Sequence, residues 1–486
     1  MSLQLKRQDL LKNGSYVGAR WLTSESDISV LNPASGDEVA RVADAAAHDV
    51  SSAIDCAATA FPSWAAKTAK ERGQILRKWF DLVIAHKEDL ARIMVAEQGK
   101  PMVEARAEID YGASFIEWYS EEAKRAYGDV YPTTVEGGRM EAVKQPVGVC
   151  GAITPWNFPV AMITRKAAPA LAAGCTMIVK PSELTPLSAL ALAELAEEAG
   201  VPQGVLNIVV SSDSAMVGQV LCNDARVRKL SFTGSTRVGK ILMEQSAQDL
   251  KRLSMELGGN APFIVFEDAD IDAAVAGAVA SKFRNAGQTC VCANRFYIHE
   301  TLYDEFAAKF SDAVSVLRVG NGAKEGTEIG PLIEAKAIDK VHGLVSEAVE
   351  AGAYALCGGA VHDYGAQYYQ PTVLTDVTQD MRIAREEIFG PVAPLFKFST
   401  EDDVVAMANQ TEYGLAAYFY ARDVGRVHRV AQALHSGIVC VNAGGFSTEV
   451  APFGGVKHSG FGREASRYGL DEYLDLKYVF VADLNR

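Results

Sequence analysis

Short apolar runs alternate with segments of helical periodicity through the middle of the chain. Residues 176–179 are β-branched or apolar over the length of a short strand. Thr185 and Pro186 follow, a pair typical of a helix N-cap and first helical position, and apolar residues between 187 and 195 are then spaced for one helix face. Gly200 is placed to end that helix. The segment predicts a buried strand and then a helix.

The same order repeats further along the chain. Apolar runs at 206–210 and 229–232 flank a helical pattern near 214–222, and runs at 263–266 and 295–299 begin a second set of strands. Strands that alternate with helices are typical of a parallel sheet with helices on both faces, because parallel neighbours need a crossover connection. The pattern therefore predicts an α/β fold with two such units.

Two segments break this alternation. Residues 127–145 have the pattern of a hairpin that turns at Gly137 and Gly138, and residues 473–481 alternate as a strand. Isolated strand pairs are marginally stable in water. We expect these strands to pair with another part of the protein or with another subunit.

Composition and charge exclude several classes of protein. The 486 residues suffice for about three domains, and 49% hydrophobic and 22% charged residues are ordinary for a soluble globular protein. A net charge of −14 disfavours nucleic acid and anionic lipid as partners. The apolar stretch 167–179 is too short for a membrane span, and no secretory signal is recognisable. Eight cysteines are too sparse for a disulfide scaffold, so we expect a cytoplasmic protein.

Glycine motifs raise the possibility of a phosphate site. Residues 234–240 follow the predicted strand at 229–232 and nearly match a Walker A loop, but Ile241 replaces the hydroxyl residue that holds Mg²⁺. From these residues alone, a phosphate cradle and a plain tight turn are equally good interpretations. A second match, G-x-G-x-x-A from Gly460 to Ala465, lacks the following chain for a βαβ unit and is interpreted as a chance match.

Three residues have side chains suited to catalysis. Cys290 follows a polar, glycine-containing segment suited to presenting a thiol, although a buried structural cysteine is the more common case. Glu256 precedes a double glycine, and Asn157 lies between two prolines that restrict its turn. A solvated glutamate and a structural turn are the ordinary alternatives. The C-x-C spacing and the lack of a His cluster argue against a metal site.

Taken together, seven segments in register make the sequence resemble the aldehyde dehydrogenase superfamily over nearly its whole length. They are PWNFP (155–159), KPSE (180–183), FTGST (232–236), ELGGN (256–260), GQTC (287–290), EIFGP (387–391) and PFGG (452–455). The resemblance implies a Rossmann-type cofactor domain, an α/β catalytic domain and a small β oligomerisation flap. The expected boundaries are 1–124 and 146–254 for the NAD-binding domain, 255–445 for the catalytic domain, and 125–145 and 446–486 for the oligomerisation strands and C-terminal bridging segment.

The resemblance also implies a mechanism. Cys290 attacks the aldehyde as a thiolate, and the Asn157 amide and the Cys290 backbone N–H stabilise the oxyanion. Hydride then passes to a nicotinamide, and Glu256 acts as the general base that activates water to hydrolyse the thioester. Lys166 and Glu464 occupy positions of supporting or proton-relay groups.

The cofactor site that the resemblance implies is a dinucleotide site without the usual glycine fingerprint. Lys180 and Glu183 would bind the adenosine ribose, Ser235 the pyrophosphate, and Glu387 the nicotinamide ribose. The full expected set is Thr154, Pro155, Trp156, Lys180, Ser182, Glu183, Gly234, Ser235, Glu387 and Phe389. Because a carboxylate at Glu183 accepts from a 2′-hydroxyl and repels a 2′-phosphate, we expect NAD to be preferred, with NADP as the alternative.

Two arginines and a serine predict the substrate class. By the resemblance, Arg165 and Arg284 stand where the superfamily lines its aldehyde tunnel, and a buried arginine needs an anionic partner. Members specific for succinic semialdehyde place a hydroxyl at the position of Ser447. The expected substrate is a small aldehyde with a terminal carboxylate, succinic semialdehyde first and glutaric semialdehyde second. The alternative is that both arginines lie at the surface in local salt bridges.

Other interpretations remain open at this stage. A cofactor-free thiol esterase would use Cys290 without Lys180, Glu183 or Glu387, and a nucleotide-hydrolysing module would use only the turn at 234–240. The resemblance implies a homo-oligomer, either a dimer or a tetramer. Cys292 either forms a disulfide with Cys290 under oxidation or is an inert neighbour.

Overall fold

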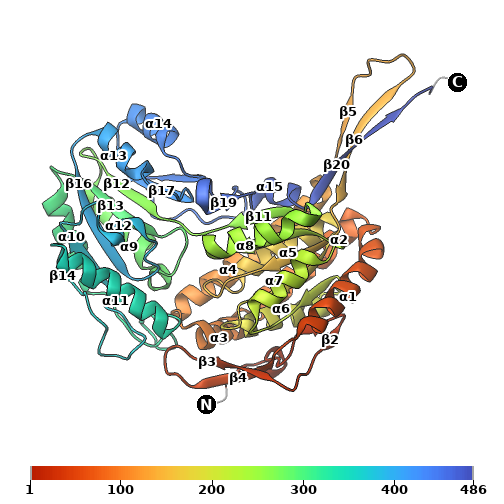
Figure 1. The fold of residues 1–486 in the computed structure, drawn as a ribbon, viewed down its shortest axis with the longest axis horizontal. Coiled ribbons are helices and arrows are strands. Elements are labelled where there is room, and N and C mark those ends of the chain that lie inside the picture. The colour runs from red at the N-terminus through yellow and green to blue at the C-terminus, as the bar shows by residue number, and fades with distance from the viewer. Residues whose placement is uncertain (1–2, 484–486) are drawn as a thin grey trace.

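A mixed sheet of eight strands forms the core of the larger lobe (Figure 1). The computed structural model describes residues 3–483. Five central strands are parallel, and antiparallel strands flank them at both edges. In spatial order they are β19 (Gly460–Phe461), β11 (Arg252–Glu256), β10 (Val227–Thr233), β7 (Val149–Ile153), β8 (Thr176–Lys180), β9 (Leu206–Ile208), β1 (Tyr16–Val17) and β2 (Arg20–Trp21). The predicted parallel α/β unit is confirmed.

Helices surround this sheet, as the alternating pattern predicted. They are α1 (Ala47–Ala65), α2 (Ala69–Ala85), α3 (Lys87–Gln98), α4 (Met102–Glu122), α5 (Ala161–Ala173), α6 (Pro186–Glu198), α7 (Ser214–Asn223) and α8 (Thr236–Ser246). The strand and helix predicted after residue 176 are β8 and α6. Helix α6 begins at Pro186, yet the Thr185 hydroxyl caps nothing. The carboxylate of Glu97 accepts from the Leu187 and Ser188 N–H groups instead, at 2.7 and 2.8 Å.

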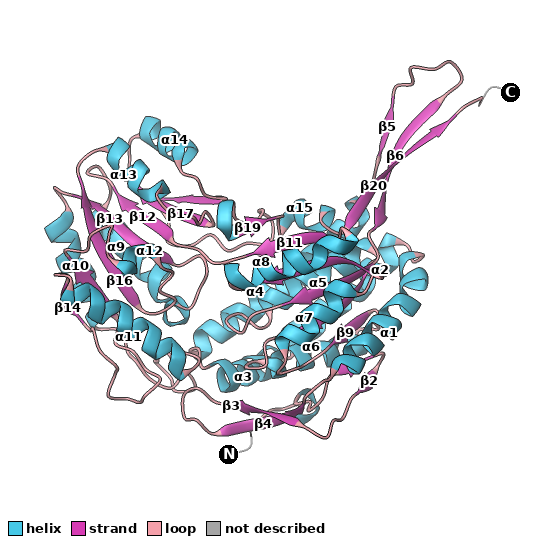
Figure 2. Cartoon of the chain, viewed as in Figure 1, coloured by secondary structure: helices cyan, strands magenta, loops and turns pink. Residues whose placement is uncertain are grey.

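A second sheet of seven strands forms the other lobe (Figure 2). In spatial order its strands are β14 (Tyr354–Cys357), β15 (Thr372–Thr375), β16 (Val392–Phe398), β13 (Ala293–His299), β12 (Ala261–Val265), β17 (Ala416–Tyr420) and β18 (Ile438–Val441), all parallel except β14. Its helices are α9 (Ile271–Phe283), α10 (Tyr303–Ser315), α11 (Ala335–Glu350), α12 (Arg382–Arg385), α13 (Glu401–Asn409) and α14 (Val424–Ala433). This sheet contains the predicted strands near 263–266 and 295–299.

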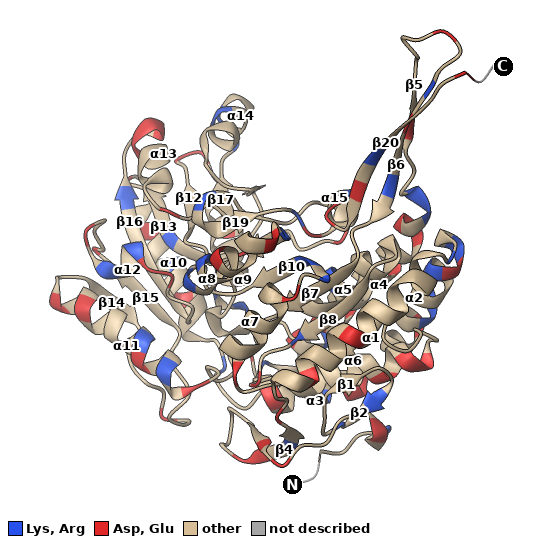
Figure 3. Ribbon diagram, turned by 45° about the vertical axis from the view of Figure 1, so that its right-hand side comes forward, with Lys and Arg blue, Asp and Glu red and all other residues tan. Residues whose placement is uncertain are grey.

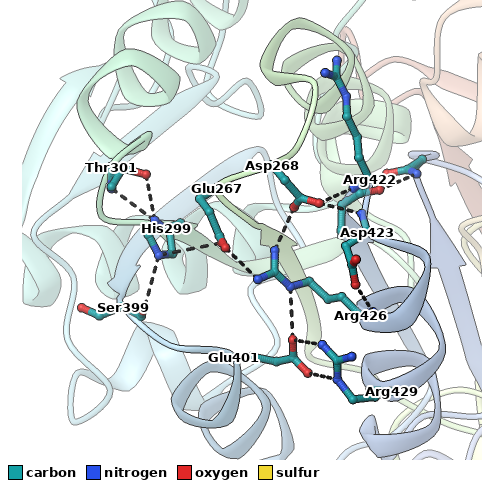
Figure 4. Close-up of polar contacts among 12 residues, drawn as sticks. Glu267, Asp268, His299, Thr301, Ser399, Glu401, Arg422, Asp423, Arg426 and Arg429 are labelled. Atoms are coloured by element: carbon teal, nitrogen blue, oxygen red, sulfur yellow. Dashed lines mark hydrogen bonds and ion pairs between the residues drawn. The ribbon is translucent and has the colours of Figure 1, made fainter.

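An ion-pair network joins the helices of the second lobe to its sheet (Figure 4). The Arg426 guanidinium on α14 contacts the carboxylates of Glu267 at 2.7 Å, Asp268 at 2.9 Å and Glu401 at 3.1 Å. Only 16% of the Arg426 side chain is exposed, so solvent screens these contacts less than those of surface pairs. The network fixes α13 and α14 against the loop that follows β12.

A three-stranded antiparallel sheet projects from the larger lobe as an arm (Figure 1). It consists of β5 (Asp129–Tyr131), β6 (Arg139–Pro146) and β20 (Leu474–Val481). The predicted hairpin is β5 and β6, with Gly137 at φ +70° in its turn. The predicted C-terminal strand is β20, which pairs with β6 over its whole length. The partner of this strand therefore lies within the same chain.

The remaining elements are short. They are the hairpin β3 (Asp27–Leu31) and β4 (Glu38–Ala43), helix α15 (Ser466–Asp471), and the 3₁₀ turns Gln8–Leu10, Ala123–Arg125, Ala247–Asp249, Arg284–Gly287 and Lys457–Ser459. Strand β19 lies within the predicted bridging segment 446–486 but pairs with β11 in the eight-stranded sheet. That segment therefore contributes one strand to the eight-stranded sheet and one, β20, to the three-stranded arm. The predicted domain boundaries otherwise stay a prediction.

Charge is distributed over both lobes. Basic and acidic positions are interspersed along the helices rather than gathered by sign (Figure 3). Among residues 3–483, no helix combines the length and apolar character needed to cross a bilayer.

Candidate active site

A cavity of 460 Å³ lies where the carboxyl edge of the first sheet faces the second lobe. Strands β7, β10 and β11 end at this edge, and their following residues line the cavity. Of the predicted residues, it brings together Pro155, Trp156, Asn157, Gly234, Ser235, Glu256, Cys290, Glu387 and Phe389. Lining residues that sequence reasoning missed include Leu257, Gly258, Ile333, Glu334, Lys336 and Lys340.

The loop that carries Cys290 has an unusual backbone. Asn285 and Ala286 have φ values of +51° and +54°, in the left-handed region, just before Gly287 at +75°. A Cβ on Gly287 would lie 2.2 Å from the Gly390 carbonyl oxygen, so only glycine fits there. Two hydrogen bonds of the Gln288 side chain restrain the loop: its oxygen accepts from the Ile333 N–H at 3.0 Å, and its amide nitrogen donates to the Asn285 carbonyl at 3.1 Å. The strained loop thus presents Cys290 to the cavity.

The Cys290 side chain is a thiol in this environment. Burial raises the pKa of Cys290 to about 12, although the nearby Arg165 charge acts in the opposite direction. The expected thiolate is therefore not the resting form, and a base must remove its proton before attack. Cys292 is also a free thiol. Its sulfur lies 3.5 Å from both the Lys282 ammonium nitrogen and the Gly287 carbonyl oxygen.

Glu256 is a buried carboxyl group without a hydrogen-bond partner. It ends β11 and lines the cavity, and neither of its carboxylate oxygens is bonded. Burial raises the pKa of Glu256 from 4.5 to about 8, with a further increase from the negative charge of Glu464. Gly454 leaves room for this side chain, because a Cβ there would lie 2.8 Å from Glu256 Oε1. A pKa near neutrality suits a general base.

Behind Glu256, Glu464 pairs with two adjacent cations of α5. One oxygen of Glu464 contacts the Arg165 guanidinium and the other the Lys166 ammonium, all three side chains being buried. Lys166 also donates to the Thr233 hydroxyl at 2.5 Å. Burial alone would raise the pKa of Glu464, but Arg165 and Lys166 outweigh it and lower that pKa. The charges of Lys166 and Glu464 both act on the Glu256 pKa, and their role as supporting or proton-relay groups stays a prediction.

The Asn157 side chain is oriented toward the nucleophile loop. Its Nδ2 donates one hydrogen to the Gln288 carbonyl at 3.1 Å, which leaves the second amide hydrogen for another acceptor. The neighbouring Trp156 ring meets Phe389 edge-on, with 5.7 Å between ring centres. Asn157 and Cys290 line the same cavity, so an oxyanion formed on a Cys290 adduct has an amide donor in its surroundings.

The predicted dinucleotide residues continue along the same sheet edge. Ser235 caps α8, accepting from the Val238 N–H at 3.3 Å, so the glycine turn leads into a helix N-terminus. Glu387 accepts from the Gly259 N–H at 3.1 Å, and burial raises its pKa to about 7. The buried Thr154 hydroxyl has no partner, and Ser182 accepts from the Leu184 N–H. An unpartnered hydroxyl, a helix N-terminus and a carboxylate suit a ribose and a pyrophosphate.

The proposed adenosine-ribose end contains an ion pair. The Lys180 ammonium donates to Glu183 at 2.9 Å and to the Ser214 hydroxyl at 2.6 Å. Glu183 retains 36% of its side-chain exposure, whereas Lys180 is buried. The carboxylate is therefore available to a ligand, with its charge partly balanced by Lys180. Ser214 was not anticipated from the sequence, because it begins α7, 31 positions beyond Glu183.

A second cavity of 240 Å³ contains two of the three predicted substrate residues. The other lining residues are Glu104, Ala107, Glu108, Tyr111 and Phe158, and the Arg284 guanidinium lies 3.4 Å from the Ser447 hydroxyl. The Arg284 guanidinium stacks 4.7 Å from the Phe158 ring centre. No carboxylate among residues 3–483 makes an ion pair with Arg284 within 4.0 Å. Glu108 is paired with Lys100, and the Arg284 charge offsets part of the increase that burial causes in the Glu104 pKa. Arg284 therefore faces the cavity with a hydroxyl partner and no direct carboxylate contact.

Arg165 differs from the expectation. It lines neither cavity and already has an anionic partner in Glu464, because α5 turns it toward the C-terminal segment. Its Nη2 atom is nevertheless buried without a hydrogen-bond partner. Tyr111 lies between the two arginines, and the charges of Arg165 and Arg284 offset part of the increase that burial causes in the Tyr111 pKa. Tyr111 is a further residue of this region that sequence reasoning missed.

Comparison with known proteins identifies the family. The family model described as "Aldehyde dehydrogenase family" matches residues 21–479. The chain belongs to the aldehyde dehydrogenase family.

Individual relatives match over full length. Succinate-semialdehyde dehydrogenase [NADP(+)] of Escherichia coli is 56% identical over 99% of this chain and 100% of its own. Glutarate-semialdehyde dehydrogenase of Pseudomonas putida is 54% identical over 99% and 100%, and 3-sulfolactaldehyde dehydrogenase of Pseudomonas putida is 53% identical over both whole chains. The crystal structure of succinate-semialdehyde dehydrogenase from Burkholderia pseudomallei has a TM-score of 0.98 at 55% identity, covering 99% of this chain and 100% of that chain.

Proposed function

We propose that this aldehyde dehydrogenase oxidises short aldehydes that carry a terminal anion, with succinic semialdehyde as the first substrate and glutaric semialdehyde as the second. The observation that carries the proposal is the Arg284–Ser447 pair, which faces a cavity that Glu104 and Glu108 also line without an ion pair to the guanidinium. A planar guanidinium beside a hydroxyl matches a carboxylate. The three relatives named above act, by their names, on aldehydes that end in a carboxylate or a sulfonate.

The proposed chemistry follows from the residues of the first cavity. Glu256 is suited to remove the Cys290 proton, and the sulfur then adds to the aldehyde carbon to form a thiohemiacetal. The Asn157 amide stabilises the oxyanion of that adduct. NAD(P)⁺ held by Ser235 and Glu387 would supply a hydride acceptor, and loss of hydride from the adduct would leave a thioester on Cys290. After Glu256 has released the Cys290 proton to solvent, it takes a proton from water, whose oxygen attacks the thioester; the C–S bond then breaks, which releases the acid and frees Cys290.

We further propose NAD as the preferred cofactor. Glu183 exposes a carboxylate at the proposed ribose end, where it would accept from a 2′-hydroxyl and repel a 2′-phosphate. Lys180 balances part of that charge, which leaves NADP as the weaker alternative. The E. coli relative is named for NADP(+), so the cofactor has to be measured on this chain.

The oligomeric state is also a proposal. The arm exposes the apolar side chains of Leu476, Tyr478 and Phe480 along β20. An exposed apolar strand favours pairing with a second copy of the chain. We therefore propose a homodimer or homotetramer, which light scattering coupled to gel filtration measures directly. The cytoplasmic location stays a prediction.

A kinetic panel tests the proposed substrate. Wild-type enzyme is assayed for NADH or NADPH formation with succinic semialdehyde, glutaric semialdehyde, 3-sulfolactaldehyde and butanal. We expect the highest kcat/KM with succinic semialdehyde and the lowest with butanal, since only butanal lacks the anion. One methylene contributes only ~1–3 kcal/mol to discrimination, so glutaric semialdehyde is also expected to react. A preference for butanal refutes the substrate assignment, whereas activity in Cys290→Ala refutes the mechanism.

A further inference from the structure

A buried lysine outside both cavities contacts the backbone of the active-site turn. Lys100 follows α3, and only 1% of its side chain is exposed. Its ammonium contacts the Glu108 carboxylate and donates to the Asn157 carbonyl at 2.8 Å. It also lies 4.1 Å from the centre of the Phe158 ring. Glu108 alone would suffice to balance the charge of Lys100, so the bond to Asn157 is an additional feature.

The Asn157 peptide is held from two sides. Besides Lys100, the Asn285 side-chain amide donates to the same Asn157 carbonyl at 3.1 Å. Asn285 is itself fixed by the Gln98 amide, which donates to its Oδ1 at 3.0 Å. The Asn157 side chain in turn donates to the Gln288 carbonyl on the nucleophile loop. The backbone and the side chain of Asn157 are therefore both restrained by the residues around it.

Glu108 extends this restraint to the next helix. While one of its oxygens holds Lys100, the other accepts from the N–H groups of Val160 and Ala161, at 3.0 and 3.4 Å. These groups lie at the start of α5, which carries Arg165 and Lys166. One buried ion pair thus contacts both the turn with Asn157 and the start of the helix that carries Arg165 and Lys166. Both ends of the turn 157–160 are fixed by the same pair.

We propose that Lys100, held by Glu108, is a positioning residue that orients the Asn157 amide toward the oxyanion. The inference rests on the proposed function, because it needs Asn157 as an oxyanion donor. Such a donor stabilises the adduct only when it lies about 2.7–3.1 Å from the oxygen. A displacement of about 1 Å in a catalytic group can lower the rate about 100-fold. Loss of the Lys100 bond is expected to cause such a displacement.

The test is a double-mutant cycle with Lys100→Met and Asn157→Ala in the full-length enzyme. Asn157→Ala is expected to lower kcat about 100- to 1000-fold. Lys100→Met is expected to lower kcat about 10- to 100-fold, by the same factor for succinic semialdehyde and butanal, with little change in KM. In the Asn157→Ala background, Lys100→Met should cause almost no further loss. The rate of Cys290 alkylation by iodoacetamide should stay at the wild-type value.

A matched control separates positioning from simple burial. Lys229 is also fully buried, pairs with Glu472 at 3.3 Å and lies 5.0 Å from the Tyr473 ring centre, but it contacts no residue of the turn. Lys229→Met should lower Tm and leave kcat unchanged. An equal kcat loss in Lys229→Met would overturn the proposal, because burial of any charged pair would then suffice.

Other outcomes of the cycle also decide whether Lys100 positions the Asn157 amide. Wild-type kcat in Lys100→Met, additive losses in the double variant, or slower alkylation each overturn the positioning role. Wild-type kcat in Asn157→Ala would show that the oxyanion assignment itself is wrong, and the role of Lys100 would fail with it. If Lys100→Met does not fold, Glu108→Gln replaces it in the cycle, since it keeps the side-chain volume and weakens the hold on Lys100. The same criteria on kcat and additivity then apply.

Discussion

The raised pKa of Glu256 predicts how the rate of turnover depends on pH. Burial, and after it the Glu464 charge, raise the pKa of Glu256 to about 8. With that pKa, about one tenth of the groups are ionised at pH 7 and about nine tenths at pH 9. Because only the carboxylate accepts a proton from water, the rate of thioester hydrolysis should rise about tenfold over this interval.

Glu464→Gln should shift this profile to lower pH. The substitution removes a negative charge that raises the Glu256 pKa, and it leaves Arg165 and Lys166 without their anionic partner. A cation close to a carboxylate lowers its pKa by about 1–3 units, so we expect the midpoint to fall by at least about one unit. The maximal rate can also change, since Lys166 loses its anionic partner. The pH midpoint is therefore the quantity that tests whether the Glu464 charge raises the Glu256 pKa.

Stopped-flow spectrophotometry at 340 nm separates the two half-reactions. The burst of NADH reports hydride transfer, and the rate after the burst reports hydrolysis where hydrolysis is the slower step. Glu472→Gln is the matched control, because Glu472 pairs with the buried Lys229 in the same C-terminal segment but is not a cause of the Glu256 shift. It should leave the midpoint unchanged.

Two results would refute this reasoning. A rate after the burst that is flat between pH 6 and pH 9 contradicts the role of Glu256 as the base in hydrolysis. A midpoint that is the same in Glu464→Gln as in the wild type contradicts the coupling between the two carboxylates.

Four further predictions concern binding and stability. Arg284→Ala should raise KM for succinic semialdehyde about 10- to 100-fold and hardly change KM for butanal, since a charge-assisted bond contributes about 1.5–3 kcal/mol; equal changes for both aldehydes would contradict it. Glu183→Gln should raise kcat/KM for NADP⁺ relative to NAD⁺, measured as initial rates. Glu256→Gln should raise Tm at pH 8.5 but not at pH 4, because a raised native pKa gives stability that is present below about 4.5 and lost as pH rises through about 8. Arg426→Ala should lower stability by about 3 kcal/mol in urea denaturation without affecting kcat, whereas Arg422→Ala, at a site 70% exposed, should change it by less than about 0.5 kcal/mol.

Local patterns were sufficient to predict most of the secondary structure around the site. The run at 229–232 lies within β10 (Val227–Thr233), and the hairpin at 127–145 contains β5 and β6. These predictions succeeded because strand length, helical period and turn residues are properties of neighbouring positions. The motif residues of the first cavity also follow strand ends, which the sequence order already indicates.

Contacts between distant segments could not be predicted in this way. Thr185 directly precedes α6, but the first N–H groups of that helix donate to the carboxylate of Glu97, which lies on α3. Arg165 was expected to face only the substrate, yet Glu464 lies against it from a segment almost three hundred positions away. The residues next to Thr185 and Arg165 in the sequence do not indicate that Glu97 and Glu464 are their neighbours. The packing of distant segments decides which carboxylate is buried beside each of them. Lys100 and Tyr111 were missed for the same reason.

The charges around Glu256 set the conditions under which it can act as a base. Arg165 and Lys166 supply two buried cations and Glu464 supplies one anion, and the charge of Arg463 also lowers the Glu256 pKa. Because buried charges need partners, the Glu256 carboxylate is stabilised, once it forms, by the positive charge that Glu464 does not balance. Arg165 therefore acts on the base while it is paired with Glu464, whereas Arg284 and Ser447 line the second cavity, where the anion of the proposed substrate would bind. The charges that hold the base and the group proposed to hold the substrate anion thus lie on different segments of the chain.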